Sequence, residues 1–447
     1  MSKLMRSVSG IRGIVGDTLT PEVLMNHVKA FLCLTEAKRI VIGRDSRPTG
    51  DAILSFVASF CRLSGVDVID VGLSTTPSVE LLTTTFKADA GIIITASHNP
   101  LEWNALKFLN KDGLFLGPED VQKLFLLADK KEFEYPDYKN MGTYEKIENA
   151  DSYHIDGTLN IPFVRVEEIK KAKFKVAIDA VNGAGSFIVP ELLEKLGCEV
   201  IKIHCSPNGT FPRGAEPVPG NLSDLCKVVK ENHCDVGFAL DPDADRCAIV
   251  GANGFPIGEE YTLAIASDEV LSQKKGNTCI NLSTSRMTED ISEKYGVKCS
   301  RAKVGEINVS LQMKETGAII GGEGNGGVIL PALHYGRDSL VAVALVLSWM
   351  ANNKGTPDKF VQENTQYTMP KKKFGLGNKS IAEIVADAKK IFKDWTSDER
   401  DGLWLSKDSS WIHVRASNTE PVIRVIAEAK TETEAEALCK KVEDLLG

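Results

Sequence analysis

The stretch Gly91–Lys107 reads GIIITASHNPLEWNALK. It opens with Gly91–Ile94, an apolar run with the β-branched content of a buried strand, and passes at once into the polar residues Thr95–Pro100. In an open α/β sheet, ligands collect beyond the carboxyl ends of the strands, so a hydroxyl group placed there faces a substrate. We interpret Ser97 as a candidate nucleophile, although a simple Ser/Asn/Pro turn explains the same residues equally well.

The succession of an apolar strand and a polar loop occurs twice more along the chain. Asp235–Leu240 runs into the acidic loop Asp241–Arg246, and Gly317–Gly321 runs into the glycine-rich loop Gly322–Gly327. This pattern indicates a coarse internal repeat of about 100 residues. It predicts three similar mixed α/β domains whose loops converge on one cleft. From Met369 the pattern changes to half-buried strands and helices, which predicts a small α+β domain.

We therefore expect four domains around a central cleft, because 447 residues are too many for one hydrophobic core. The predicted domains are residues 1–152 with the serine loop, 153–254 with the acidic loop, 255–368 with the glycine-rich loop, and 369–447 with a C-terminal phosphate-binding loop.

The composition limits the classes of function. A net charge of -8 argues against a surface that binds nucleic acid. The 10 cysteines show no CxxC spacing, which indicates a reducing compartment and no structural zinc. The N-terminus lacks the apolar core of a signal peptide, and the run Val341–Leu347 is too short to span a bilayer. We expect a cytoplasmic protein, a monomer or homodimer, that binds a small molecule and neither nucleic acid nor a membrane.

The acidic loop DPDADR carries Asp241, Asp243 and Asp245 at alternating positions. Carboxylates this close repel one another unless a cation neutralises them, and oxygen ligands suit Mg²⁺ or Ca²⁺. An EF-hand would require glycine and glutamate where Arg246 and Ala252 stand, which argues against a calcium sensor. Three carboxylates leave room on Mg²⁺ for a phosphate oxygen, and Arg246 can pair with another. An acidic surface turn is the alternative.

Two further loops have the composition of ligand-binding loops. Arg415–Pro421 reads RASNTEP and is followed by Arg424, so two guanidinium groups, two hydroxyls and backbone amides surround one turn. Such a loop suits a phosphate, and a plain hairpin turn is the alternative. Glu323 and Asn325 could exchange hydrogen bonds with sugar hydroxyls. Their glycine-rich loop lacks the spacing of a Walker or Rossmann phosphate loop, which argues against nucleotide binding.

Charged residues near Ser97 are candidates for proton transfer. Lys107 could act on a hydroxyl proton or supply positive charge, and His98 could take part in catalysis or only shape the loop. Arg12 lies between Gly10 and Gly13, where the backbone can turn tightly and approach a ligand, although a solvated turn fits as well.

The motifs TASHNP, DPDADR, GEGNGG and RASNTEP occur in the order and rough spacing of the α-D-phosphohexomutase family, which the chain resembles over essentially its whole length. The resemblance implies a phosphoserine at Ser97 and one Mg²⁺ ion held by that phosphate with Asp241, Asp243 and Asp245. It implies that Arg12 and Lys107 assist proton transfer and that Glu323 binds sugar hydroxyls. The implied phosphate-binding residues are Arg415, Ser417, Asn418, Thr419 and Arg424.

In that family the phosphoserine gives its phosphoryl group to a hexose monophosphate, and the other phosphate of the resulting 1,6-bisphosphate returns to serine. The resemblance therefore implies transfer of a phosphoryl group between the 6- and 1-positions of a hexose phosphate. The loops are most similar to a subgroup named phosphoglucosamine mutase or phosphomannomutase/phosphoglucomutase. We expect glucosamine phosphate as the substrate, with mannose and glucose phosphates as alternatives.

Two other classes of protein compete with this interpretation. A phosphoserine-dependent sugar phosphatase would use the same serine and metal but transfer the phosphoryl group to water; the dedicated phosphate-binding loop favours a mutase. A non-catalytic sugar-phosphate-binding protein would not require the reactive serine and its metal ligands. The chain also departs from the family pattern: Asn325 stands where many members have serine, Gly327 where histidine is common, and Ala105 and Asn418 where glycine is usual.

Overall fold

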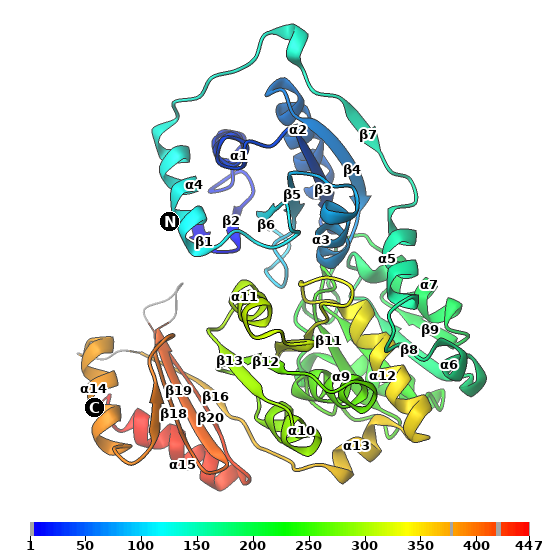
Figure 1. Ribbon diagram of the computed structural model, residues 1–447, viewed down its shortest axis with the longest axis vertical. Helices are drawn as coiled ribbons and strands as arrows, with labels where there is room; N and C mark the ends of the chain where they lie inside the picture. The colour runs from blue at the N-terminus through cyan, green and yellow to red at the C-terminus, as the bar shows by residue number, and fades with distance from the viewer. Residues whose placement is uncertain (1–3, 376–378, 417–421, 447) are drawn as a thin grey trace.

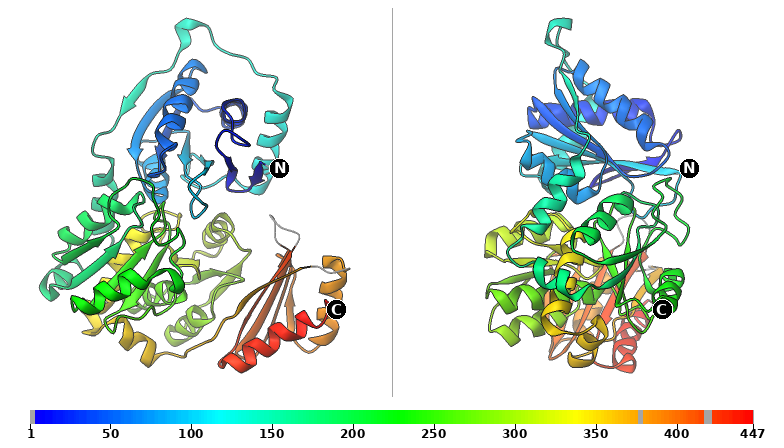
Figure 2. Two further views of the ribbon diagram at one scale, coloured as in Figure 1. Left: turned by 180° about the vertical axis from the view of Figure 1, so that it is seen from behind. Right: turned by 90° about the vertical axis from the view of Figure 1, so that its right-hand side faces the viewer.

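The computed structural model describes residues 4–375, 379–416 and 422–446. Its strands form four separate sheets, which follow one another along the chain (Figure 1). The domain that carries the first sheet lies above the second and third, and the C-terminal domain lies to one side (Figures 1 and 2). The predicted class, three α/β domains followed by an α+β domain, is confirmed.

The first three sheets repeat one strand order. In the first domain β3 (Arg39–Arg44) lies between β4 (Asp67–Leu73) and β5 (Ala90–Ile94), all parallel, and β6 (Trp103–Asn110) returns antiparallel against β5. The second sheet has the same layout in the order β11-β10-β8-β9, and the third in the order β15-β14-β12-β13. The loop between the third and fourth strand of each unit therefore occupies an equivalent position.

This topology explains why the three motif loops meet. The serine loop follows β5, the acidic loop joins β10 (Val236–Leu240) to β11 (Cys247–Gly251), and the glycine-rich loop joins β14 (Ile320–Glu323) to β15 (Gly327–Ile329). The strands that lead into the loops were predicted, but the antiparallel return strand was not. The remaining strands of these units are β1 (Met5–Ser7), β2 (Gly10–Ile14), β7 (Tyr144–Lys146), β8 (Lys175–Asp179), β9 (Glu199–Ile203), β12 (Thr278–Asn281) and β13 (Cys299–Ala302).

Helices connect and cover these strands. The helices of the first domain are α1 (Pro21–Thr35), α2 (Gly50–Leu63), α3 (Thr76–Thr85) and α4 (Pro118–Lys130). The second contains α5 (Ala150–Leu159), α6 (Val166–Ala172), α7 (Gly185–Lys195) and α8 (Ser223–Glu231), and the third α9 (Glu260–Gln273), α10 (Met287–Tyr295), α11 (Glu306–Thr316), α12 (Ser339–Asn353) and α13 (Pro357–Glu363). Short 3₁₀ turns lie at Tyr138–Asn140 and Pro219–Asn221.

The C-terminal domain is an antiparallel sheet in the order β16-β20-β19-β18-β17. Its strands are β16 (Lys371–Gly375), β17 (Thr396–Asp398), β18 (Leu403–Lys407), β19 (Ser410–Ala416) and β20 (Val422–Glu428), and its helices are α14 (Ile381–Ile391) and α15 (Glu432–Glu443). Apolar side chains such as Val414 and Val425 pack with both helices into a separate core. The domain is thus able to position its side of the cleft as a unit.

Helix α12 explains how the second and third domains are joined. Its residues 339–350 are all buried, as expected for a helix that is apolar on every side. It packs against α9 and α6, and Leu345 belongs to one hydrophobic cluster that also contains Ile178 and Phe238 of the second sheet. These two domains therefore share a core. Within the described part of the chain, no helix combines the length and apolar composition required to cross a membrane.

Asp338 fixes the start of α12. Its Oδ1 accepts hydrogen bonds from the backbone N–H groups of Leu340 and Val341, which caps the helix. Its Oδ2 lies 2.7 Å from Nε2 of His154 and 2.9 Å from Nε2 of His334. These contacts connect α5 to α12 and account for both histidines as structural residues.

Replacing Leu345 with alanine tests the shared core. Leu345 is fully buried, so the loss of packed methyl groups should lower the free energy of unfolding by about 2–5 kcal/mol. Leu126→Ala in α4, where the side chain is 63% exposed, is the matched control and should change it by less than about 0.5 kcal/mol. Urea unfolding followed by circular dichroism measures both. Equal effects of the two substitutions would contradict the packing described for α12.

Candidate active site

The motif loops line one cavity of ≈ 530 Å³. Ser97 comes from the first domain, Arg246 from the second, Glu323 from the third, and Arg415 with Arg424 from the fourth. The convergence predicted from the sequence pattern is therefore observed. A ligand in this cavity contacts four separate domains at once.

Ser97 is held in a constrained loop. Its backbone φ of 49° lies in the left-handed region, which costs a non-glycine residue roughly 1–2 kcal/mol. The buried guanidinium group of Arg47 donates hydrogen bonds to the carbonyl oxygens of Ser97, Asn99 and Pro100, at 2.7, 2.7 and 2.6 Å. Asp45 in turn accepts from Nε of Arg47 at 3.1 Å. Arg47 thus holds the serine loop in one shape.

Each of the three aspartates of the acidic loop has an oxygen held by short contacts to the protein. Oδ1 of Asp241 accepts from the backbone N–H groups of Asp245 and Arg246, at 3.1 Å each. Oδ2 of Asp243 accepts from Lys107 Nζ and Thr76 Oγ1, at 2.7 Å each. Oδ2 of Asp245 accepts from Nη2 of Arg337 at 2.5 Å.

The other oxygens of these aspartates suit a metal ion. Oδ1 of Asp243 and Oδ1 of Asp245 are buried without a hydrogen-bond partner, with Nε of Arg246 3.7 Å from the latter, and Oδ2 of Asp241 accepts a long hydrogen bond from the hydroxyl of Ser97 at 3.3 Å. One ligand atom from each aspartate lies within 4.8 Å of the others. A buried carboxylate oxygen without a donor is costly, and a divalent cation removes that cost. The residues present therefore fit the predicted metal site.

The charges in the acidic loop are unevenly balanced. Burial raises the pKa of Asp241 well above its ordinary value, and the neighbouring Asp245 and Asp243 raise it further. Burial alone would also raise the pKa of Asp243, but Lys107 lowers it overall. The carboxylates of Asp243 and Asp245 raise the pKa of Lys107 although its burial acts in the opposite direction. Lys107 therefore stabilises the ionised form of Asp243, whereas burial and the neighbouring carboxylates destabilise that of Asp241.

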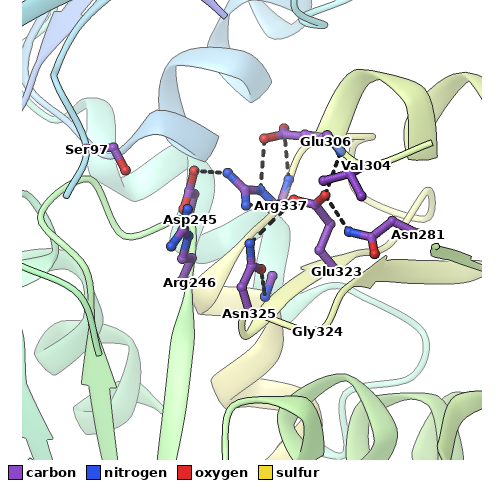
Figure 3. Close-up of polar contacts among 12 residues, drawn as sticks. Ser97, Asp245, Arg246, Asn281, Val304, Glu306, Glu323, Gly324, Asn325 and Arg337 are labelled. Carbon is purple, nitrogen blue, oxygen red and sulfur yellow. Dashed lines mark hydrogen bonds and ion pairs between the residues drawn. The ribbon is translucent and has the colours of Figure 1, made fainter. Parts of the chain in front are cut away.

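Glu323 is held rigidly at the opposite wall of the cleft (Figure 3). Its Oε1 accepts from Asn281 Nδ2 at 2.7 Å and from the backbone N–H of Gly305 at 2.9 Å. Its Oε2 accepts from Nη1 of Arg337 at 2.9 Å and from Asn325 Nδ2 at 3.5 Å. Burial alone would raise the pKa of Glu323, but Arg337 and Asn281 lower it, so the carboxylate stays ionised.

Two arginines of the fourth domain form a basic wall of the cleft. Arg415 on β19 pairs directly with Arg424 on β20 in the antiparallel register. Like charges at opposed positions destabilise a sheet. Asp401 lies 3.6 Å from Nη1 of Arg415, and a phosphate could also pair with these guanidinium groups. Nε of Arg415 is buried without a hydrogen-bond partner. The predicted Ser417, Asn418 and Thr419 lie outside the described residues.

The other predicted residues also line the cleft. Arg12 donates from Nη1 to Asn99 Oδ1, and Arg246 donates to Glu216 at 3.0 Å. Nδ1 of His98 lies 3.5 Å from Oγ of Ser97. Burial, together with Arg246 and Arg12, lowers the pKa of His98 to about 4, so its imidazole is neutral at neutral pH.

The sequence interpretation missed three cations of this site, which are Arg47, Arg337 and Lys371. Arg47 follows β3 in a polar loop, so the rule that singled out Ser97 could also have singled out Arg47. Arg337 carried no such signal, because its partners are distant in sequence. The run 371–373 has the pattern of a solvated strand end, yet Lys371 reaches Glu259 at 2.9 Å and lines the cleft.

Four successive parts of the chain match the domain models of the phosphoglucomutase/phosphomannomutase family. Its alpha/beta/alpha domain I matches residues 3–135, domain II residues 152–254, domain III residues 258–367, and the C-terminal domain residues 368–445. These four matches cover every loop that lines the cleft.

Individual relatives agree with this match. A phosphoglucomutase/phosphomannomutase of Thermococcus kodakarensis is 37% identical over 95% of this chain and 94% of its own. A phosphoglucosamine/phosphogalactosamine mutase of Sulfurisphaera tokodaii is 30% identical over 100% of this chain and 99% of its own. The crystal structure of a family protein from Burkholderia thailandensis superposes with a TM-score of 0.83 at 26% identity, over 99% and 98% of the two chains. The chain belongs to the phosphoglucomutase/phosphomannomutase family of metal-dependent phosphohexomutases, and is thus an isomerase.

Proposed function

We propose that this enzyme moves a phosphoryl group between the 6- and 1-positions of glucosamine phosphate, through a phosphorylated Ser97 and a hexose 1,6-bisphosphate intermediate. The amino sugar is supported by relatives named phosphoglucosamine mutase. The alternative substrates are mannose and glucose phosphates, supported by the relative named phosphoglucomutase/phosphomannomutase. We further propose domains over residues 1–152, 153–254, 255–368 and 369–447.

One observation supports this proposal: a single cleft brings together two separate groups of residues that could each hold a phosphate. One lies at Ser97 beside the three aspartates, and the other at the opposed pair Arg415 and Arg424. A phosphatase requires only the first. A mutase requires both, because the sugar turns round while its non-reacting phosphate is held.

The reaction needs a metal ion at the aspartates. Asp241, Asp243 and Asp245 would hold one Mg²⁺ ion, which when bound supplies positive charge to the transferring phosphoryl group. Arg246, next to the acidic loop, would pair with a phosphate oxygen.

The chain's own residues perform the remaining chemistry. The P–O bond to Ser97 Oγ breaks as a sugar hydroxyl forms its bond to phosphorus. The sugar hydroxyl loses its proton and Ser97 Oγ gains one, and the positive charges of Lys107 and Arg12 would assist this net proton transfer. Glu323 and Asn325 hold the sugar hydroxyls, and His98 supports the serine loop. In the second half the other phosphate transfers to Ser97, and the sugar oxygen regains a proton.

Substitution of Ser97 by alanine tests the phosphoryl carrier. Without its hydroxyl no phosphoserine forms, so we expect turnover to fall by more than about 1,000-fold. Ser64→Ala is the matched control, because the Ser64 hydroxyl is buried without a hydrogen-bond partner at the end of α2. Coupled spectrophotometric assays of both variants give the comparison. Intact mutase activity in Ser97→Ala would exclude this mechanism.

Substitution of Asp243 by asparagine tests the metal site. We expect weaker Mg²⁺ binding, turnover reduced by more than about 100-fold, and only a modest change in the affinity for sugar phosphate. Asp51→Asn, at a side chain that is 80% exposed, should leave all three unchanged. Calorimetry gives the Mg²⁺ affinity and steady-state kinetics give the turnover. Unchanged turnover of Asp243→Asn at limiting Mg²⁺ would contradict the metal assignment.

Side-by-side turnover of glucosamine, mannose and glucose 6-phosphates tests the substrate. We expect the highest kcat/KM with glucosamine 6-phosphate, and the isomerised 1-phosphate as the product in every case. Assays of inorganic phosphate and of sugar 1-phosphate distinguish the two classes of enzyme. Stoichiometric release of inorganic phosphate without isomerisation would identify a phosphatase instead.

A further inference from the structure

Arg337 and Gly327 form a fitted pair within the third domain. A Cβ atom added at Gly327 would lie 2.4 Å from Cδ and 3.0 Å from Cγ of Arg337, closer than packed atoms approach. The backbone of Gly327 lies outside the left-handed region, so its conformation does not itself require glycine. Glycine is therefore needed at residue 327 to make room for the stem of Arg337.

The space at Gly327 lets one guanidinium group reach the acidic loop, the glycine-rich loop and the start of α11. Nη2 of Arg337 donates to Asp245, and Nη1 donates to Glu323 at 2.9 Å. Nε donates to Oε2 of Glu306 at 3.0 Å (Figure 3). The pKa of Arg337 would fall on burial alone, but these carboxylates raise it well above its ordinary value. The planar fork of arginine matches several carboxylates at once, which a lysine cannot do.

We propose that Arg337 is a positioning residue that couples the metal loop to the sugar-binding loop, and that Gly327 provides the space it needs. By holding Oδ2 of Asp245, Arg337 leaves Oδ1 to a cation, and by holding Oε2 of Glu323 it fixes that carboxylate at the wall of the cleft. The identity of the sugar ligand rests on the function proposed above. A cation at Asp245 and a sugar at Glu323 each restrain Arg337, so each ligand orders the site for the other.

The first test measures Mg²⁺ binding alone, by calorimetry on the full chain without sugar. Loss of the group that orients a metal ligand weakens metal affinity by about 10–100-fold, and we expect this from Arg337→Ala. Arg337→Lys keeps the positive charge but not the planar, forked set of donors, so its Mg²⁺ affinity should fall nearly as much. Gly327→Ala should also weaken binding, because its methyl group displaces Arg337. Gly220→Ala, where an added Cβ meets no atom within 4 Å, is the matched control and should bind Mg²⁺ as the parent does.

The double substitution tests the fitted pair itself. In the Arg337→Ala background the methyl group of Gly327→Ala enters vacated space, so it should change Mg²⁺ affinity by less than about twofold, a non-additive result typical of residues in contact. Additive losses would overturn the pairing. Tighter Mg²⁺ binding by Arg337→Ala would overturn the positioning role, because removal of a nearby positive charge alone has that effect. Mg²⁺ affinity of Arg337→Lys equal to that of the parent would also overturn the positioning role.

The second test measures coupling, with glucosamine 6-phosphate binding to the Ser97→Ala chain so that no turnover occurs. With Arg337 present, Mg²⁺ should tighten sugar-phosphate binding by about fivefold or more. With Arg337→Ala, the ratio of the sugar-phosphate Kd without Mg²⁺ to the Kd with Mg²⁺ should approach one. If this ratio is the same with and without Arg337, the coupling is overturned. If circular dichroism shows that Arg337→Ala is unfolded, Gly327→Ala and Arg337→Lys replace it in the measurements of Mg²⁺ binding and of coupling.

The outcomes separate this proposal from the proposed function. If the parent chain shows no mutase activity but Mg²⁺ binding responds as expected, the function fails and the positioning role stands. If the parent is an active mutase and substitutions of Arg337 and Gly327 leave its Mg²⁺ affinity unchanged, the positioning role is wrong but the proposed function stands.

Discussion

The repulsion among the buried carboxylates of the acidic loop is the constraint on which the rest of the structure depends. Three aspartates follow a fully buried strand, so water cannot screen their charges. Arg246 of the same loop balances part of this charge, and two further cations come from other domains: Lys107 from the first and Arg337 from the third. The electrostatic balance of one loop thus requires three domains to be in contact, and the cleft forms where they meet.

The repeated strand order makes this contact possible. In each of the three α/β units the chain reverses into an antiparallel strand after the third parallel one, and the functional loop lies at that reversal. Since ligands collect beyond the carboxyl ends of strands, three copies of one topology present three loops to a common space. The fourth domain has a different fold and a different role, because its opposed pair Arg415 and Arg424 supplies positive charge away from the aspartates.

Rigid support surrounds the groups that we propose to meet the substrate. Arg47 fixes the carbonyl groups of the serine loop, and Arg337 fixes carboxylates of the acidic and glycine-rich loops. Both arginines are buried, and neither lies within one of the four motifs. Held in this way, Ser97 and Glu323 keep their positions, which would lower the reorganisation that the proposed phosphoryl transfers require.

The sequence by itself determined the α/β class, the repeat of three units, the strands that end in polar loops, and the chemical character of Ser97 and of Asp241, Asp243 and Asp245. These are local properties, since hydrophobic periodicity and abrupt changes of residue type are visible within a few positions. Only the tertiary structure decided which oxygen of each aspartate stays open, that Arg47 and Arg337 hold the loops, that Gly327 makes room for Arg337, and that Lys371 reaches the cleft. Those facts depend on contacts between residues far apart in the chain, and a buried guanidinium group has no sequence pattern of its own because its partners are set by the packing of domains.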